Sequence, residues 1–271
     1  MNKVIMVVCD ALRDDTAAAT MGYLQHIVEV KHASRYTVIA ELPTMSRPLY
    51  ETLHTGVPCS QHGVTNNQIV RRSIMPNVFE LARAAGKVTA ASAFYWYSEL
   101  YNRVPYDPLA DGEVDNPDLA IQHGRFYMSE SYPDLEVFLA GGMLLRRFAP
   151  DYLLIHPMAM DYIGERFGSD SSEYRNNAIV QDQIMANLIP PALQAGYTIL
   201  VTADHGISTD KTHGGTLPAV RHVPLYFIPA DGNARGDTRE SVTQCRIAPT
   251  LCHLLGMETP PTMTEAPILP A

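Results

Sequence analysis

Short apolar segments alternate with helix-like segments along most of this chain, and no other feature of the sequence restricts its fold as strongly. The strand-like segments are residues 3–9, 33–42, 87–95, 151–157, 197–204 and 223–230. The helix-like segments are residues 47–56, 77–86, 134–150, 171–196 and 241–256. Strands that alternate with helices require crossover connections, which place helices on the faces of a mostly parallel sheet. We therefore predict an α/β fold with a mostly parallel central sheet flanked by helices.

Two segments interrupt this alternation. Residues 95–131 are rich in aromatic residues, Asp and Pro, and we predict an irregular loop or small cap laid over the sheet. Residues 258–271 include Pro260, Pro261, Pro267 and Pro270, and we expect a loose tail there. Length alone does not distinguish one α/β domain from two smaller ones. No internal repeat or low-complexity segment is present, and we treat residues 1–271 as a single domain.

The charge of the chain argues against one class of partner. The formal net charge is -9 and the isoelectric point is about 5.5, so nucleic acid is not expected as a bulk electrostatic partner. An acidic protein that handles anions needs a local positive centre, from metal ions or a few arginines. A small-molecule ligand is the partner we expect, and the composition predicts no oligomeric state.

The N-terminal segment and the cysteines indicate a cytoplasmic protein. The apolar run over residues 4–9 is too short for the core of a signal peptide, and no cleavage pattern follows it. No apolar segment approaches the ~20 residues that cross a membrane, so we expect no membrane span. The four cysteines lack CxxC spacing, which argues against a zinc or redox motif and favours reduced thiols.

Three acidic residues lie at or soon after the ends of predicted strands: Asp10, Asp161 and Asp204. In open α/β sheets, ligands bind outside the carboxyl ends of the strands. These three residues are therefore the first indication of a functional site.

Four clusters of polar residues extend that indication. The first contains Asp10, and the second is Thr44-Met45-Ser46-Arg47-Pro48. The third places Asp161 and Glu165 at i and i+4, where both face one side of a helix. The fourth is the segment VTADHGISTDKTHGG, which supplies Asp204, His205 and His213. Carboxylates and imidazoles that converge from separate strand ends suit divalent metals such as zinc or manganese.

Each of these residues also has an ordinary structural explanation. Asp10 and Asp204 fit as helix N-caps, because Asp often caps a helix that follows a strand. His205 and His213 precede glycines and fit as turn residues. Independent caps and turns, however, have no reason to supply a complete set of metal ligands together.

Taken in order, the motifs resemble the signature of the alkaline phosphatase superfamily, and most closely its type I phosphodiesterase/nucleotide pyrophosphatase branch. The matching segments are VVCDALRDD, PTMSRPLYETLHTGVPCSQHGV, DYIGERFG, ADHG, THGG and CRIAPTLCHLLG, which span nearly the whole chain. The resemblance implies an alkaline phosphatase-like three-layer sandwich with a small cap. It also implies hydrolysis of phosphate esters with two divalent metal ions, zinc first and manganese or magnesium as alternatives.

The resemblance implies a role for each site residue. One metal would be held by Asp10, Ser46, Asp204 and His205, and the second by Asp161, Glu165 and His213. The nucleophile is Ser46, not Thr44, because the family's helix register, counted back from Thr55-Gly56, selects it. Coordination of a serine hydroxyl to a divalent cation favours the alkoxide. The start of the following helix would add backbone donors for phosphoryl oxygens.

This sequence departs from the family pattern at two positions. Glu165 replaces a histidine, which makes the second metal site harder. This either favours manganese or magnesium or leaves the second site weak, unless Glu165 points to solvent. Leu49 stands where the branch has an asparagine that contacts the phosphoryl oxygen, and leucine cannot donate. Arg47 is the replacement we predict, because guanidinium matches phosphoryl geometry; the alternative is a solvent-facing arginine.

The leading functional hypothesis is a metal-dependent hydrolase of phosphodiesters or nucleotide-like substrates that forms a phosphoryl-Ser46 intermediate. A phosphomonoesterase, a phosphonate hydrolase and a sulfatase are the enzyme alternatives, with sulfatase disfavoured because Tyr50 occupies a position where sulfatases usually have arginine. A degenerate metal-binding protein without activity is the alternative outside enzymes. Five aromatic residues after the third strand would either wall a substrate pocket or pack in the interior: Phe94, Tyr95, Trp96, Tyr97 and Tyr101.

Overall fold

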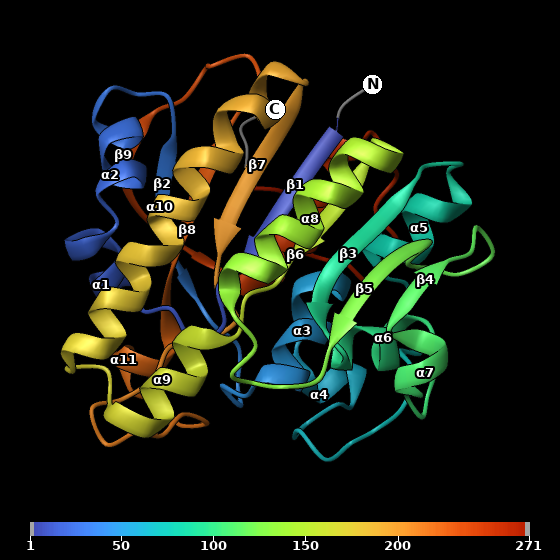
Figure 1. The fold of residues 1–271 in the computed structure, drawn as a ribbon, viewed down its shortest axis with the longest axis horizontal. Coiled ribbons are helices and arrows are strands. Elements are labelled where there is room, and N and C mark those ends of the chain that lie inside the picture. Colours follow the sequence, from blue (N-terminus) through green and yellow to red (C-terminus); the bar gives the residue numbers. More distant parts are fainter. Residues whose placement is uncertain (1–2, 269–271) are drawn as a thin grey trace.

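A nine-stranded sheet runs through the computed structural model, which describes residues 3–268 (Figure 1). The strands lie in the order β4-β5-β3-β6-β1-β7-β8-β2-β9. Their bounds are β1 (Lys3–Val8), β2 (Ser34–Ile39), β3 (Thr89–Phe94), β4 (Glu113–Asp115), β5 (His123–Tyr127), β6 (Tyr152–Ile155), β7 (Tyr197–Thr202), β8 (His222–Ile228) and β9 (Gly236–Thr243).

Most neighbouring strands are parallel. The exceptions are β8, which is antiparallel to β7 and β2, and β4, which is antiparallel to β5. At the centre, β1 pairs in parallel with β6 and β7, so that Val4 lies opposite both Tyr152 and Thr198. Both faces of β1 are covered, which is why its sequence is apolar almost throughout and does not alternate. The predicted α/β fold with a mostly parallel sheet is confirmed.

Helices cover both faces of the sheet. Their bounds are α1 (Asp14–Thr20), α2 (Gly22–Glu29), α3 (Ser46–Thr55), α4 (Cys59–His62), α5 (Val78–Ala84), α6 (Trp96–Tyr101), α7 (Pro108–Asp111), α8 (Asp134–Phe148), α9 (Ala159–Phe167), α10 (Ser172–Gln194), α11 (Pro218–Arg221) and α12 (Ile247–Leu255), with a 3₁₀ turn at Gln244–Arg246. In Figure 1, α8 and α10 lie in front of the sheet and α3 and α5 lie behind it. Among residues 3–268, none of the helices combines the length and apolar character needed to cross a membrane.

Helix α3 is buried along its whole length and is held at both ends. It begins at Ser46 after an extended Met45, and Pro48 is tolerated because residues in the first turn have no intrahelical acceptor for their N–H groups. It ends at Gly56, whose φ of 65° is the left-handed conformation that glycine adopts without strain. A helix enclosed in this way fixes the position of its first residue, Ser46.

The prediction of an irregular cap over residues 95–131 is wrong in part. This segment contains α6 and α7, but it also supplies β4 and β5, which extend the sheet at its edge beside β3. Strand β5 has the sequence HGRFY, in which polar residues alternate with glycine and phenylalanine. Such a short strand near the sheet edge carries too weak an apolar pattern to be recognised in sequence.

The prediction of a loose tail is wrong for residues 258–268, and residues 269–271 lie outside the described residues. The Arg246 guanidinium donates to the carbonyls of Ala266 and Pro267 at 2.9 and 2.8 Å. The Ile268 N–H donates to Thr250 Oγ1 at 2.9 Å. Proline kept this segment from forming regular structure, but its carbonyl oxygens and apolar side chains still pack against the last helix.

Candidate metal and phosphoryl-transfer site

Three neighbouring strands, β6, β1 and β7, present polar side chains at their carboxyl ends. They are followed by His156, Asp10 and Asp204, and all three side chains are fully buried. Because these strands are parallel and adjacent, the three residues meet at one edge of the sheet. The structure therefore brings together two residues that the sequence singled out and one that it did not.

The start of α3 delivers Ser46 to the same place. Ser46 Oγ lies 3.1 Å from Nε2 of His205, and both side chains are buried. Thr44 lies elsewhere: its Oγ1 accepts from the Gly214 N–H at 2.9 Å and donates to the Gly215 carbonyl at 3.0 Å. Thr44 thus anchors the loop that carries His213, and Ser46 is the hydroxyl that faces the cluster.

The first group of candidate ligands consists of Asp10, Asp204 and His205, which each offer a ligand atom within 4.8 Å of the others. His205 Nε2 lies 3.3 Å from Asp204 Oδ2 and 3.7 Å from Asp10 Oδ1. Asp204 Oδ1 accepts from the Ala11 N–H at 3.2 Å, which leaves Oδ2 directed at His205.

The second set of predicted ligands is Asp161, Glu165 and His213. The ligand atoms that lie within 4.8 Å of one another here belong to Asp161, His205 and His213, so His205 is common to both places. His213 Nε2 lies 3.8 Å from Asp161 Oδ1 and 3.4 Å from Glu165 Oε1. The two carboxylates share one side of α9, as their spacing predicts, so Glu165 faces the site although almost half of its side chain is exposed. The rings of His205 and His213 stack with centroids 4.3 Å apart, which makes the two groups adjacent. All seven residues predicted as metal ligands therefore lie together.

Three buried carboxylates of this site each have an oxygen that lacks a hydrogen-bond partner within residues 3–268. These oxygens are Asp10 Oδ1, Asp161 Oδ1 and Asp204 Oδ2. Burial raises the pKa of Asp10 and of Asp161 well above the usual range, and raises the pKa of Asp204 to about 6. Buried anionic oxygens are costly unless a cation neutralises them. Together with the imidazoles and the Ser46 hydroxyl, they form a donor set that fits divalent metal ions.

The two histidines have opposite titration behaviour. Burial and the positive charge of His213 lower the pKa of His205 well below its usual value. Burial also opposes protonation of His213, but the hydrogen bond to Glu165 and the charge of Asp161 outweigh it and raise the pKa of His213 to about 9. The same contact with His213 lowers the pKa of Glu165. Metal binding at the second group would therefore release a proton from His213.

Two residues that sequence reasoning missed contact Asp10. The Tyr50 hydroxyl donates to Asp10 Oδ2, and His156 Nε2 lies 3.2 Å from the same oxygen. Because Oδ2 has both contacts, Oδ1 is the oxygen left to bind a metal. The position of His156, directly after a buried strand like Asp10 and Asp204, was the available signal. Tyr50 lies one helical turn after Ser46, and no signal beyond that spacing marked it.

Arg47 is buried and does not point to solvent, so the solvent-facing alternative is wrong. Its Nη2 donates to Glu99 Oε2 at 2.8 Å, its Nε donates to the Asn67 carbonyl at 2.9 Å, and its guanidinium lies 4.5 Å from the centroid of the Trp96 ring. Nη1 is buried with no hydrogen-bond partner in the described part of the chain. Leu49 is buried in a small apolar cluster with Ala40 and Cys59 and offers no hydrogen-bond donor to a phosphoryl oxygen.

Most of the aromatic residues after β3 pack in the interior. Phe94, Tyr97 and Tyr101 are buried, and Tyr97 stacks on Tyr50 with ring centroids 4.5 Å apart. Tyr95 and Trp96 are only partly buried and remain the two that a substrate pocket could use.

Comparison with known families identifies the chain. Residues 4–217 match the family described as type I phosphodiesterase / nucleotide pyrophosphatase. The protein belongs to this family. Its place in the alkaline phosphatase superfamily, which the ordered motifs predicted, is therefore confirmed.

Curated relatives of this family member include transferases and a mutase. Human GPI ethanolamine phosphate transferase 2, catalytic subunit, is 25% identical over 277 residues, covering 96% of this chain and 27% of the relative. A 2,3-bisphosphoglycerate-independent phosphoglycerate mutase of Haloquadratum walsbyi is 32% identical over 125 residues, covering 44% of this chain and 24% of the relative. The chain therefore spans about a quarter of the length of these relatives.

Solved structures confirm the fold of this family member. Murine ectonucleotide pyrophosphatase/phosphodiesterase 5 superposes with a TM-score of 0.75 at 14% identity, covering 96% of both chains. A phosphonate monoester hydrolase from Silicibacter pomeroyi superposes with a TM-score of 0.69 at 14% identity, covering 99% of this chain and 76% of the other. The alkaline phosphatase PafA gives a TM-score of 0.67 at 11% identity, covering 98% of both chains.

Proposed function

We propose that the protein is a metal-dependent hydrolase that cleaves phosphodiester or nucleotide-like substrates through a phosphoryl-Ser46 intermediate. One observation carries this proposal. The hydroxyl of Ser46 lies 3.1 Å from Nε2 of His205, the residue shared by two groups of possible metal ligands, and three carboxylate oxygens of these groups have no hydrogen-bond partner in the described residues. In this environment an adjacent base and metal coordination can both activate the Ser46 hydroxyl at neutral pH.

The donor set divides between two ions. Asp10, Ser46, Asp204 and His205 would hold one, and Asp161, Glu165 and His213 would hold the other. Bound divalent ions would supply the positive charge that stabilises the serine alkoxide and the phosphoryl oxygens. We infer zinc for the fully buried first group; the second group, with two carboxylates and one imidazole, also suits manganese or magnesium.

The residues of the chain then account for the covalent steps. Ser46 Oγ forms a bond to phosphorus while the bond from phosphorus to the leaving oxygen breaks, and the leaving alcohol takes up a proton. Water then attacks the phosphoryl group and breaks its bond to Ser46 Oγ, which regains a proton. The products are an alcohol and a phosphate monoester, and the enzyme is restored.

The first turn of α3 has fewer free backbone N–H groups for the phosphoryl oxygens than its position as a helix start predicts. Pro48 has no N–H, and the Arg47 N–H donates to Asn67 Oδ1 at 3.1 Å. The same hydrogen bond fixes the orientation of the Asn67 amide, because only its oxygen can accept. Its Nδ2 group has no hydrogen bond to the rest of residues 3–268. We propose that Asn67 Nδ2 and Arg47 Nη1 donate to the phosphoryl oxygens in place of Leu49.

A phosphotransferase is the second candidate, and a specific observation favours it. The human relative aligned over 96% of this chain is an ethanolamine phosphate transferase by name. In such a reaction an alcohol would replace water in the second step. The further alternatives are a phosphomonoesterase, a phosphonate hydrolase, a sulfatase and an inactive metal-binding protein. The phosphonate monoester hydrolase from Silicibacter pomeroyi has the same fold as this chain.

A substrate screen with defined metals tests these proposals. The chain is stripped with a chelator, reloaded with zinc, manganese or magnesium, and assayed with aryl phosphodiesters, phosphomonoesters, phosphonates and sulfates, with and without acceptor alcohols. We expect the aryl phosphodiester to turn over fastest. If part of the phosphoryl product is found on the acceptor alcohol as well as on water, the phosphotransferase is favoured. Ser46→Ala should remove turnover, whereas Ser60→Ala, at an exposed serine of α4, should not. Turnover that survives in Ser46→Ala would refute the assignment of Ser46 as nucleophile. Two bound metal ions per chain would favour the enzyme, and one or none would favour the inactive alternative.

A further inference from the structure

The outer face of α8 carries an apolar stripe. Its inner residues Val137 and Phe138 are buried against the sheet, whereas Leu135, Leu139 and Met143 are 51%, 52% and 57% exposed. These three residues follow one another at intervals of four and therefore lie on one side of the helix. In Figure 1, α8 lies in front of the sheet and no other element lies in front of α8.

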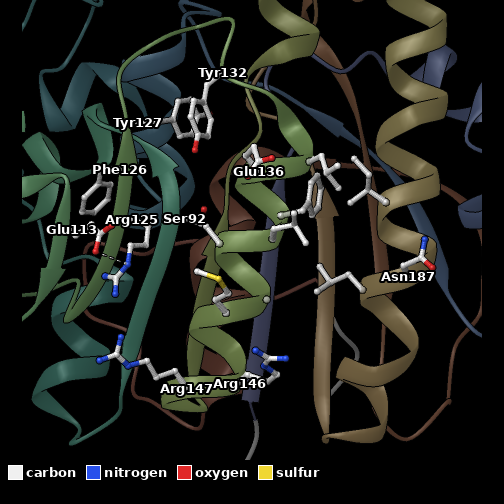
Figure 2. A pocket seen from close by; sticks show the side chains of 18 of the residues that line it. Ser92, Glu113, Arg125, Phe126, Tyr127, Tyr132, Glu136, Arg146, Arg147 and Asn187 are labelled. Atoms are coloured by element: carbon white, nitrogen blue, oxygen red, sulfur yellow. Dashed lines mark ion pairs between the residues drawn. The ribbon is translucent and has the colours of Figure 1, made fainter.

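A hollow of about 1200 Å³ flanks the stripe. Figure 2 shows its walls, which come from β5 on one side of α8 and from α10 on the other. Apolar side chains from both sides line it, among them Phe126, Tyr132, Val180 and Leu188. Exposed apolar side chains that lie together and are bordered by polar residues occur at interaction surfaces.

Charged residues at the two ends of the stripe indicate what covers it. The exposed Glu136 lies in the first turn of α8, and the exposed Arg146 and Arg147 lie in its last turn. No ion pair within residues 3–268 involves any of these three side chains. The surface thus has a negative end, an apolar middle and a positive end.

A second copy of the same helix complements these charges and this apolar stripe if it packs antiparallel to the first. The two-fold axis then crosses the outer face of α8 at the level of Gly141. Positions equally far before and after Gly141 then face each other, so Leu139 meets Met143 and Glu136 meets Arg146 of the second copy. A parallel copy would instead place Glu136 beside Glu136 and Arg146 beside Arg146. Gly142 lies close to the axis and has open space where a Cβ would lie, so no side chain there keeps the two helices apart.

We propose that the outer face of α8 is a self-complementary dimer interface, in which a second copy of this chain packs its α8 antiparallel to the first. The contact surface is the same on both copies, as a two-fold dimer requires. It lies on the face of the sheet opposite α3 (Figure 1), so the proposed dimer contact does not involve the helix that carries Ser46.

The mass in solution tests the proposal directly. Sedimentation or light scattering of the full chain, from about 1 to about 100 μM, should give twice the chain mass of 29.9 kDa. Leu139→Glu should raise the dimer dissociation constant at least tenfold. Leu109→Glu, at a position 98% exposed on α7, should not. Circular dichroism and retained Ser46-dependent turnover would show that both variants fold.

Charge exchange tests the geometry. Glu136→Arg and Arg146→Glu should each weaken the dimer, because each places like charges opposite one another twice. An equimolar mixture of the two variants should restore a mixed dimer, since both contacts then join opposite charges, and the double variant should restore the homodimer. A chain that is monomeric throughout this concentration range, a dimer insensitive to Leu139→Glu, or a mixture that does not associate would overturn the proposal. Binding of the monomeric chain to phosphatidylcholine vesicles through this face would overturn it in favour of a lipid contact.

Discussion

His156 and Asp10 follow the neighbouring strands β6 and β1, and their side chains are in contact, with His156 Nε2 3.2 Å from Asp10 Oδ2. The Tyr50 hydroxyl donates to the same oxygen. A carboxylate whose second oxygen is held in this way presents its first oxygen in one fixed direction. Residues that orient a metal ligand commonly contribute ten- to a hundredfold to metal affinity. His156 and Tyr50 are therefore positioning residues for Asp10.

Replacement of the Tyr50 hydroxyl should weaken the first metal site. We expect Tyr50→Phe to lower zinc affinity about tenfold, because Asp10 loses one of the two contacts that orient it. Calorimetric titration of the metal-free protein with zinc measures this without reference to activity. Tyr97→Phe is the matched control, because Tyr97 stacks on Tyr50 but its hydroxyl has no partner within residues 3–268. Equal losses in the two variants would show that packing, and not the contact with Asp10, is responsible.

Glu165 should decide the metal preference of the second group. We expect Glu165→His to raise zinc affinity relative to manganese there by about tenfold, because imidazole is a softer ligand than carboxylate. Metal content after dialysis against mixed zinc and manganese measures the preference. Glu173→His, at an exposed position of α10, controls for a histidine added to the surface. An unchanged ratio of the two metals would mean that Glu165 does not bind the ion.

The sequence predicted the central strands and the convergence of the candidate ligands for a common physical reason. β1 and β7 are buried on both faces, so their apolar residues are continuous, and Asp10 and Asp204 stand out where the apolar runs stop. Convergence of these residues then follows from parallel pairing alone.

The remaining features depend on contacts between distant segments. β4, β5 and β9 lie toward the sheet edges and carry alternating or exposed polar residues, so no apolar run marks them. The burial of Arg47 depends on Glu99 and Trp96, which reach it from α6. A single sequence shows no spacing that would link such pairs.

Asn67 should contribute to turnover if its free amide group donates to the phosphoryl oxygens. We expect Asn67→Ala to lower kcat/KM about ten- to a hundredfold, the effect of losing one hydrogen bond to a charged group. Asn67 Oδ1 also accepts from the Arg47 N–H, so Asn67→Asp, which keeps that acceptor but removes the donor, separates the two roles. Steady-state kinetics of all three proteins on an aryl phosphodiester measure the effect.

Asn66 supplies the control for Asn67, because it lies in the same loop and its side chain accepts from the Gln68 N–H at 2.9 Å. Asn66→Ala should change kcat/KM little. If Asn66→Ala and Asn67→Ala reduce turnover equally, loop order explains both losses. If Asn67→Asp keeps full activity, the donor role is wrong.

Glu51 makes the stability of the fold depend on pH. It lies inside α3, and its Oε1 accepts from the Ser73 hydroxyl at 2.6 Å. Burial raises the pKa of Glu51 from 4.5 to about 7. A carboxyl group with a raised folded-state pKa favours the folded state while it is protonated. This contribution is fully present below about pH 4.5 and is lost as the pH rises through 7.

Glu51→Gln should therefore stabilise the protein at high pH. Glutamine is neutral at every pH and keeps the oxygen that Ser73 contacts, so the variant avoids the cost of ionising a buried group. Relative to the unchanged protein, its free energy of unfolding should rise by up to about 3 kcal/mol between pH 5 and pH 8. Urea unfolding of the metal-free proteins at several pH values measures this difference without a contribution from metal binding. Glu29→Gln, at the exposed end of α2, controls for removal of one negative charge. A stability difference that stays constant between pH 5 and pH 8 would show that Glu51 does not titrate in this range.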